Sequence, residues 1–117
     1  MFMNAVMVSG DVQESVFYDQ TTGAQKPQFV VNMTVLDADT DEKFECQVTE
    51  GFQLLEALKK AKNDGEPVDV LRQIADQLRA QLPPKFTPMQ LQVLRFKGKQ
   101  VAFIKLVCRL LSIGATA

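Results

Sequence analysis

Apolar and polar residues alternate at both ends of this chain, whereas its middle has helical periodicity. The clearest alternation covers residues 28–36, where apolar residues share one side of the expected strand and polar residues share the other. Similar runs cover residues 2–18, 43–49, 88–96 and 100–111, the last two joined by a turn at Lys97-Gly98-Lys99. The pattern therefore predicts three strands, a helical segment, and a final hairpin.

The first expected strand contains Gly10, and a glycine inside a strand pattern predicts a bulge or a sharp bend. Its apolar residues on one side of the alternation are Val6, Val8, Val12, Val16 and Tyr18. The strand from Phe29 to Val35 and the following one, with Phe44 and Cys46, are expected to turn their apolar sides to the core.

Two helical pieces are expected over residues 51–62 and 67–82. Asn63-Asp64-Gly65 ends the first, and Pro83-Pro84 stops the second. The second carries a stripe at helical spacing that we expect to face the core: Leu71, Ile74, Ala75, Leu78 and Leu82. The fold class predicted from this order is mainly β with α. It is a single five-stranded OB-like barrel over residues 1–117 (β-β-β-α-β-β), with a helical insertion at about 51–82.

The net charge of −1 conceals an uneven distribution. Residues 1–64 sum to −6 and residues 65–117 to +5, and residues 82–117 contain no acidic residue. Such an asymmetry can present a basic face on a nearly neutral molecule, and basic residues interleaved with aromatic ones suit a polyanion.

The residue inventory argues against catalysis. The chain has no histidine, which removes the commonest general base and metal ligand, and it has no glycine-rich phosphate-binding loop. We therefore expect no enzyme activity, no metal and no cofactor. Cys46 and Cys108 match no metal or redox spacing and are expected to be buried free thiols. Without a signal peptide or a long apolar run, the default location is cytoplasmic, with no membrane partner.

Binding to single-stranded nucleic acid requires cations along the backbone path and flat rings on which bases stack. The final hairpin supplies most of the candidates, and its cations should lie close together. The full set of candidate residues is Phe17, Tyr18, Lys26, Lys43, Arg95, Phe96, Lys97, Lys99, Phe103, Lys105 and Arg109. Strand alternation exposes only one of Phe17 and Tyr18, unless a bulge intervenes.

The element order, the bend at Gly10, the strand from Phe29 to Asp37 and the helix before the final hairpin resemble small OB-fold single-stranded-DNA-binding proteins of phages, plasmids and mobile elements. The resemblance covers most of residues 2–111. It implies DNA binding without sequence preference, in replication or recombination, by a homo-oligomer, most simply a homodimer. Residues 112–117 contain no acid, so the acidic recruitment tail of the familiar bacterial members is not expected.

An alternative interpretation is a protein-interaction or scaffold module without nucleic-acid binding. In it, the face from Val101 to Arg109 and the stripe from Leu71 to Leu82 would bind a protein partner, and the acidic pI of 5.4 favours it. A third interpretation is an α+β scaffold that forms no barrel.

Overall fold

The computed structural model describes residues 1–18, 20–98 and 105–114. Its elements, in chain order, are β1 (Phe2–Tyr18), β2 (Gln25–Asp37), β3 (Lys43–Glu50), α1 (Gln53–Asn63), α2 (Val68–Gln81), β4 (Pro88–Lys97) and β5 (Lys105–Ile113). The first four expected strands are confirmed within a few residues of their predicted ends, and the last is confirmed from Lys105 onward. Its expected start at residues 100–104 lies outside the described residues. The helical segment between β3 and β4 consists of two separate helices, so the order is β-β-β-α-α-β-β.

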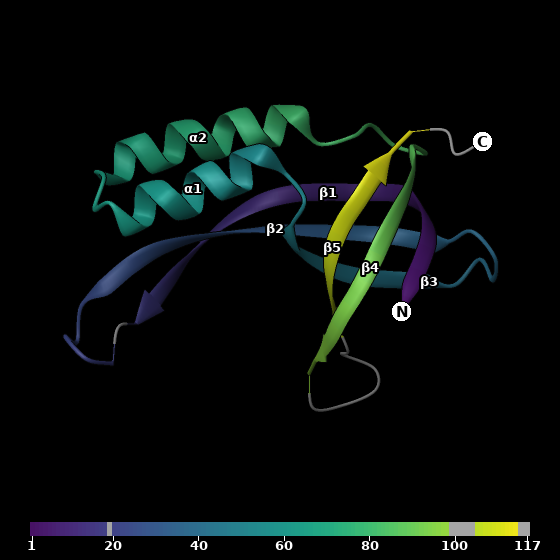
Figure 1. The fold of residues 1–117 in the computed structure, drawn as a ribbon, viewed down its shortest axis with the longest axis horizontal. Helices are drawn as coiled ribbons and strands as arrows, with labels where there is room; N and C mark the ends of the chain where they lie inside the picture. The colour runs from purple at the N-terminus through teal and green to yellow at the C-terminus, as the bar shows by residue number, and fades with distance from the viewer. Residues whose placement is uncertain (19, 99–104, 115–117) are drawn as a thin grey trace.

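The five strands form one closed sheet in the order β1-β2-β3-β5-β4, and β1 closes the sheet by pairing with β4. All neighbouring pairs are antiparallel except β3 and β5, which run parallel. Because the sheet is closed, it argues against the third interpretation, an α+β scaffold that forms no barrel. In Figure 1 the two helices lie side by side along one side of the sheet, and the end of β4 and the start of β5 lie on the side away from them.

A bulge in β1 changes which residues face the core. The register with β2 shifts between Met7 and Ser9. Before the shift the odd-numbered Met3, Ala5 and Met7 are buried, and after it Val12 is buried. The bulge expected around Gly10 is therefore present, next to that glycine. The expectation that Val6 and Val8 lie on the same side as Val12 is wrong, because the extra residue in β1 reverses the alternation.

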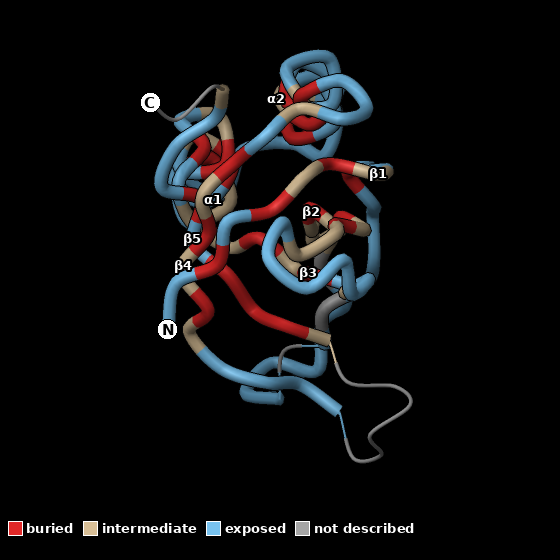
Figure 2. The backbone as a smooth tube through the Cα atoms, turned by 90° about the vertical axis from the view of Figure 1, so that its right-hand side faces the viewer, coloured by how far each residue is buried: buried red, intermediate tan, exposed pale blue. Residues whose placement is uncertain are grey.

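The core lies between the inner sides of the strands and the facing sides of the two helices (Figure 2). From α2 it receives Leu71, Ala75 and Leu78, with Ile74 and Leu82 partly buried against it. The amphipathic stripe predicted for this helix thus faces the core, as expected. Phe29 and Phe44 also pack against the core from the sheet.

Both cysteines are buried free thiols in the adjacent strands β3 and β5, as predicted. The neighbouring Cys108 thiol and burial raise the pKa of the Cys46 thiol. A buried thiol with a raised pKa forms little of the reactive thiolate. Both side chains are fully buried, so the two cysteines act as core packing.

Candidate nucleic-acid interface

Directly paired residues in a sheet point to the same side, so the strand registers define which side chains share the surface away from the core. One row crosses all five strands from Ser9 through Thr34, Glu45 and Lys105 to Lys97. The adjacent row runs from Asp11 through Asn32, Gln47 and Val107 to Arg95. We call this surface the outer face; it comprises both rows and Gln13.

The polar side chains of the outer face hold one another in place. Lys105 Nζ reaches across β3 and donates to Asn32 Oδ1 at 3.3 Å. Asn32 Nδ2 in turn donates to Gln13 Oε1 at 2.6 Å. Thr34 Oγ1 lies 2.9 and 3.0 Å from the two carboxylate oxygens of Glu45. The first two contacts join side chains of β5, β2 and β1, and the third joins β2 to β3.

The outer face contains a hollow of about 230 Å³. Most of its lining residues are polar: Ser9, Gly10, Asp11, Gln13, Asn32, Met33, Thr34 and Glu45. The hollow therefore offers mainly hydrogen-bonding groups to a ligand.

Three of the predicted cations meet at one end of the outer face. Lys97 pairs with Lys105, and Arg95 pairs with Val107 two residues along β5. Arg95 and Lys97 are exposed, and no carboxylate of the described residues forms an ion pair with either. The prediction that the final hairpin gathers its cations is confirmed for these three residues.

Arg109 does not belong to this group. Its Nε donates to Glu50 Oε2 at 2.6 Å, and its Nη1 approaches Gln92 Oε1 at 3.4 Å. β3 and β5 run parallel with a register shift that brings Glu50 opposite Arg109. The charge of Arg109 is thus compensated within the sheet, which separates it from the other hairpin cations.

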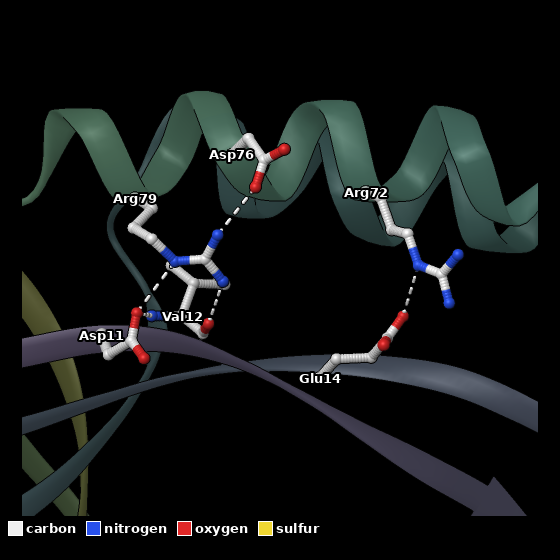
Figure 3. A network of polar contacts seen from close by, with 6 residues as sticks. All are labelled: Asp11, Val12, Glu14, Arg72, Asp76 and Arg79. Carbon is white, nitrogen blue, oxygen red and sulfur yellow. Dashed lines mark hydrogen bonds and ion pairs between the residues drawn. The ribbon is translucent and has the colours of Figure 1, made fainter.

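The two arginines of α2 also bind carboxylates, in this case on β1 (Figure 3). Arg79 Nε donates to Asp11 Oδ1 at 2.8 Å, and Arg79 Nη2 donates to the backbone carbonyl of Val12. Arg72 Nε donates to Glu14 Oε1 at 3.0 Å. The hydrogen bond to Asp11 raises the pKa of Arg79, and the hydrogen bond to Glu14 raises the pKa of Arg72. Among the described residues Arg95 is therefore the arginine left without a carboxylate partner.

The aromatic candidates lie at strand ends, on the side of the sheet opposite the outer face. Phe96, the next-to-last residue of β4, pairs with the buried Leu106 and is 61% exposed, as predicted. Tyr18 at the end of β1 is on the same side as the buried Val12 and is 59% exposed. Phe17 pairs with Lys26 between β1 and β2, and the description does not extend to these two side chains. Lys99 and Phe103 lie outside the described residues. Lys43 is exposed at the start of β3, two residues from Glu45 on the same strand.

Comparisons with protein-family models, curated proteins and solved structures found no match to this chain. Its function is therefore inferred from geometry. Neither described helix has the length and apolar character needed to cross a bilayer. Within residues 1–18, 20–98 and 105–114, no three cysteine or acidic side chains are grouped to hold a metal ion.

The sequence predicted the cations of the outer face, but it did not predict the hydrogen bonds among its polar side chains. The alternation marked Asn32, Thr34, Glu45 and Gln47 as the solvent side of β2 and β3. It gave no sign that Asn32 bonds to Gln13 and Lys105, or that Thr34 bonds to Glu45. These contacts depend on pairings between different strands. Phe2 and Phe86, 66% and 68% exposed, were also not anticipated as exposed aromatics.

Proposed function

We propose that this protein binds single-stranded DNA without strict sequence preference through the outer face, as an OB-like barrel acting in replication or recombination in the cytoplasm. The observation that carries the proposal is the cationic end formed by Arg95, Lys97 and Lys105. Among the described residues Arg95 and Lys97 have no carboxylate partner there, whereas the other arginines are in ion pairs. Uncompensated cations that share one surface attract a polyanion, because binding releases the counterions of the nucleic acid.

The sheet topology supports the same surface. An OB barrel binds oligonucleotides on the face of its second and third strands, between the loop joining strands one and two and the loop joining strands four and five. Here that face carries the hydrogen bond of Asn32 to Gln13 and that of Thr34 to Glu45. Exposed Tyr18 and Phe96 lie at the strand ends next to those two loops. Phosphates would follow the cations, and bases would stack on these rings or enter the hollow.

Burial of several of its expected contact residues weakens the alternative interpretation as a protein-interaction module. Leu71 and Leu78 of the helical stripe are buried in the core, and Val107 of the last strand is buried on the outer-face side of β5. These side chains are not available to a protein partner without unfolding.

The direct test is fluorescence anisotropy of a labelled oligo-dT of about 30 nucleotides, with duplex DNA as the competitor and the salt concentration varied. We expect tighter binding to the single strand than to the duplex, and weaker binding as salt increases. Lys97→Ala should lower the affinity and reduce the salt slope by roughly 0.7, the contribution of one phosphate contact on a single strand.

The matched control is Lys85→Ala, because Lys85 lies in the loop before β4, 5.3 Å over the ring of Phe86, and not on the outer face. It should leave the salt slope unchanged. Absence of binding at low salt, or an equal loss from both variants, would refute the proposed site.

A further inference from the structure

The outer face holds a carboxylate where a polyanion is expected to bind. Glu45 is exposed on β3 in the same row as Lys105 and Lys97, and it lines the hollow. A carboxylate repels phosphate, so a bound strand must present something other than its backbone at this position. In a single strand, the groups that can donate hydrogen bonds to a carboxylate are the N–H groups of the bases.

The position of the Glu45 carboxylate is fixed by its neighbours. Thr34 Oγ1 contacts both of its oxygens, at 2.9 and 3.0 Å. An ionised carboxylate accepts about four hydrogen bonds, so acceptor capacity remains on both oxygens. The result is an oriented pair of acceptors at the rim of the hollow. The other carboxylate in its lining, Asp11, is in an ion pair with Arg79, and the remaining polar groups are amides and hydroxyls.

A cation lies directly beside these acceptors. Lys105 is the register partner of Glu45 on β5, and its ammonium is held over the outer face by the 3.3 Å hydrogen bond to Asn32 Oδ1. An ammonium has three donors, so two remain for a ligand. The surface thus presents two adjacent acceptors from Glu45 and a neighbouring donor from Lys105.

We infer that this hollow is a base-edge subsite that prefers guanine; the inference rests on the proposed function. The Watson–Crick edge of guanine presents two adjacent donors, N1–H and the 2-amino group, followed by the O6 acceptor. The donors match the two oxygens of Glu45, as the parallel N–H groups of a guanidinium do, and O6 accepts from Lys105. Thymine has one donor between two acceptors, and adenine and cytosine each place a ring-nitrogen acceptor beside their amino group, which opposes a carboxylate.

The test varies the base and leaves the protein unchanged. Labelled oligo-dT of about 30 nucleotides is compared with the same strand carrying a few isolated guanines, or hypoxanthines at the same positions. Hypoxanthine lacks the 2-amino group and so removes one of the two donors. We expect the guanine strand to bind on the order of tenfold more tightly than the hypoxanthine or thymine strand, since a bidentate contact discriminates between bases by about that factor.

Glu45→Gln replaces one acceptor with a donor, so it should abolish the guanine preference while oligo-dT binding persists. Glu66→Gln, which removes one charge before α2, is the matched control and should keep the preference. Equal affinities for the three strands would overturn the subsite but leave the proposed function intact. A guanine preference that survives Glu45→Gln would also overturn it. Failure to bind any strand would overturn both inferences.

Discussion

At the scale of single residues, Gly51 shows most clearly how the backbone limits the sequence. It lies between β3 and α1 with φ +108°, a conformation that side-chain-bearing residues rarely adopt. A Cβ at this position would lie 2.7 Å from Leu110 Cβ and would also collide with the backbone carbonyl of Leu110. The close approach of this turn to β5 therefore requires glycine.

We predict that Gly51→Ala lowers the free energy of unfolding much more than Gly65→Ala does. Gly65 also has a positive φ, but a Cβ there would meet nothing within 4 Å, so its cost is the backbone term of about 1–2 kcal/mol. Gly51→Ala adds the collision with Leu110, about 1–3 kcal/mol more. Urea denaturation of the two variants measures the difference, and equal losses would contradict the packing argument.

The buried cysteines give a second prediction at this scale. Because Cys46 and Cys108 are fully buried, and the Cys108 thiol and burial raise the pKa of Cys46, neither thiol should react with Ellman's reagent in the folded protein near pH 8. Both should react once guanidinium unfolds the chain. Rapid labelling of the native protein would show that the two thiols are more accessible than the structure indicates.

At the scale of elements, α2 closes the exposed edge of β1. An unpaired strand edge is open to pairing with other chains, and covering it is one way in which proteins prevent this. Here Arg79 contacts both the Asp11 carboxylate and the Val12 carbonyl, and Arg72 contacts Glu14 further along the strand (Figure 3). The helix thus stabilises the first strand through its polar side as well as through its buried stripe.

Arg79→Ala should therefore destabilise the fold by about 1–2 kcal/mol. The figure is discounted for solvent screening because the Arg79 side chain is 44% exposed. Arg72→Ala removes a more exposed ion pair and no backbone contact, so it should cost less and serves as the control. Thermal unfolding of both variants checks the order, and a larger loss from Arg72→Ala would show that the backbone contact is unimportant.

Local pattern predicted the elements well because it depends on neighbours in sequence. The strands, the stripe on α2 and the helix-ending prolines all lie within such local patterns. The local pattern did not predict which residues of β1 face the core, because the bulge between Met7 and Ser9 reverses the alternation. The local pattern also could not predict the ion pair of Arg109 with Glu50. That contact arises because β3 pairs in parallel with β5, which follows it in the sequence only after two helices and β4.

At the scale of the whole molecule, the uneven charge of the sequence is partly retained in space. Arg72, Arg79 and Arg109 are in ion pairs, whereas Arg95, Lys97 and Lys105 lie together at one end of the closed sheet. The acidic residues Asp39, Asp41 and Glu42 lie in the turn between β2 and β3. A net charge near zero is therefore compatible with a local basic surface.

The central claim is that a single strand of DNA lies on the outer face. It is tested most directly by a ¹H–¹⁵N NMR titration of the protein with oligo-dT, because each backbone amide reports on its own surroundings. The account predicts that shifts concentrate at Thr34, Glu45, Lys97 and Lys105, and that the exposed side of α2 at Gln77 stays unchanged. Shifts confined to α2, or no shifts at saturating oligonucleotide, would contradict it.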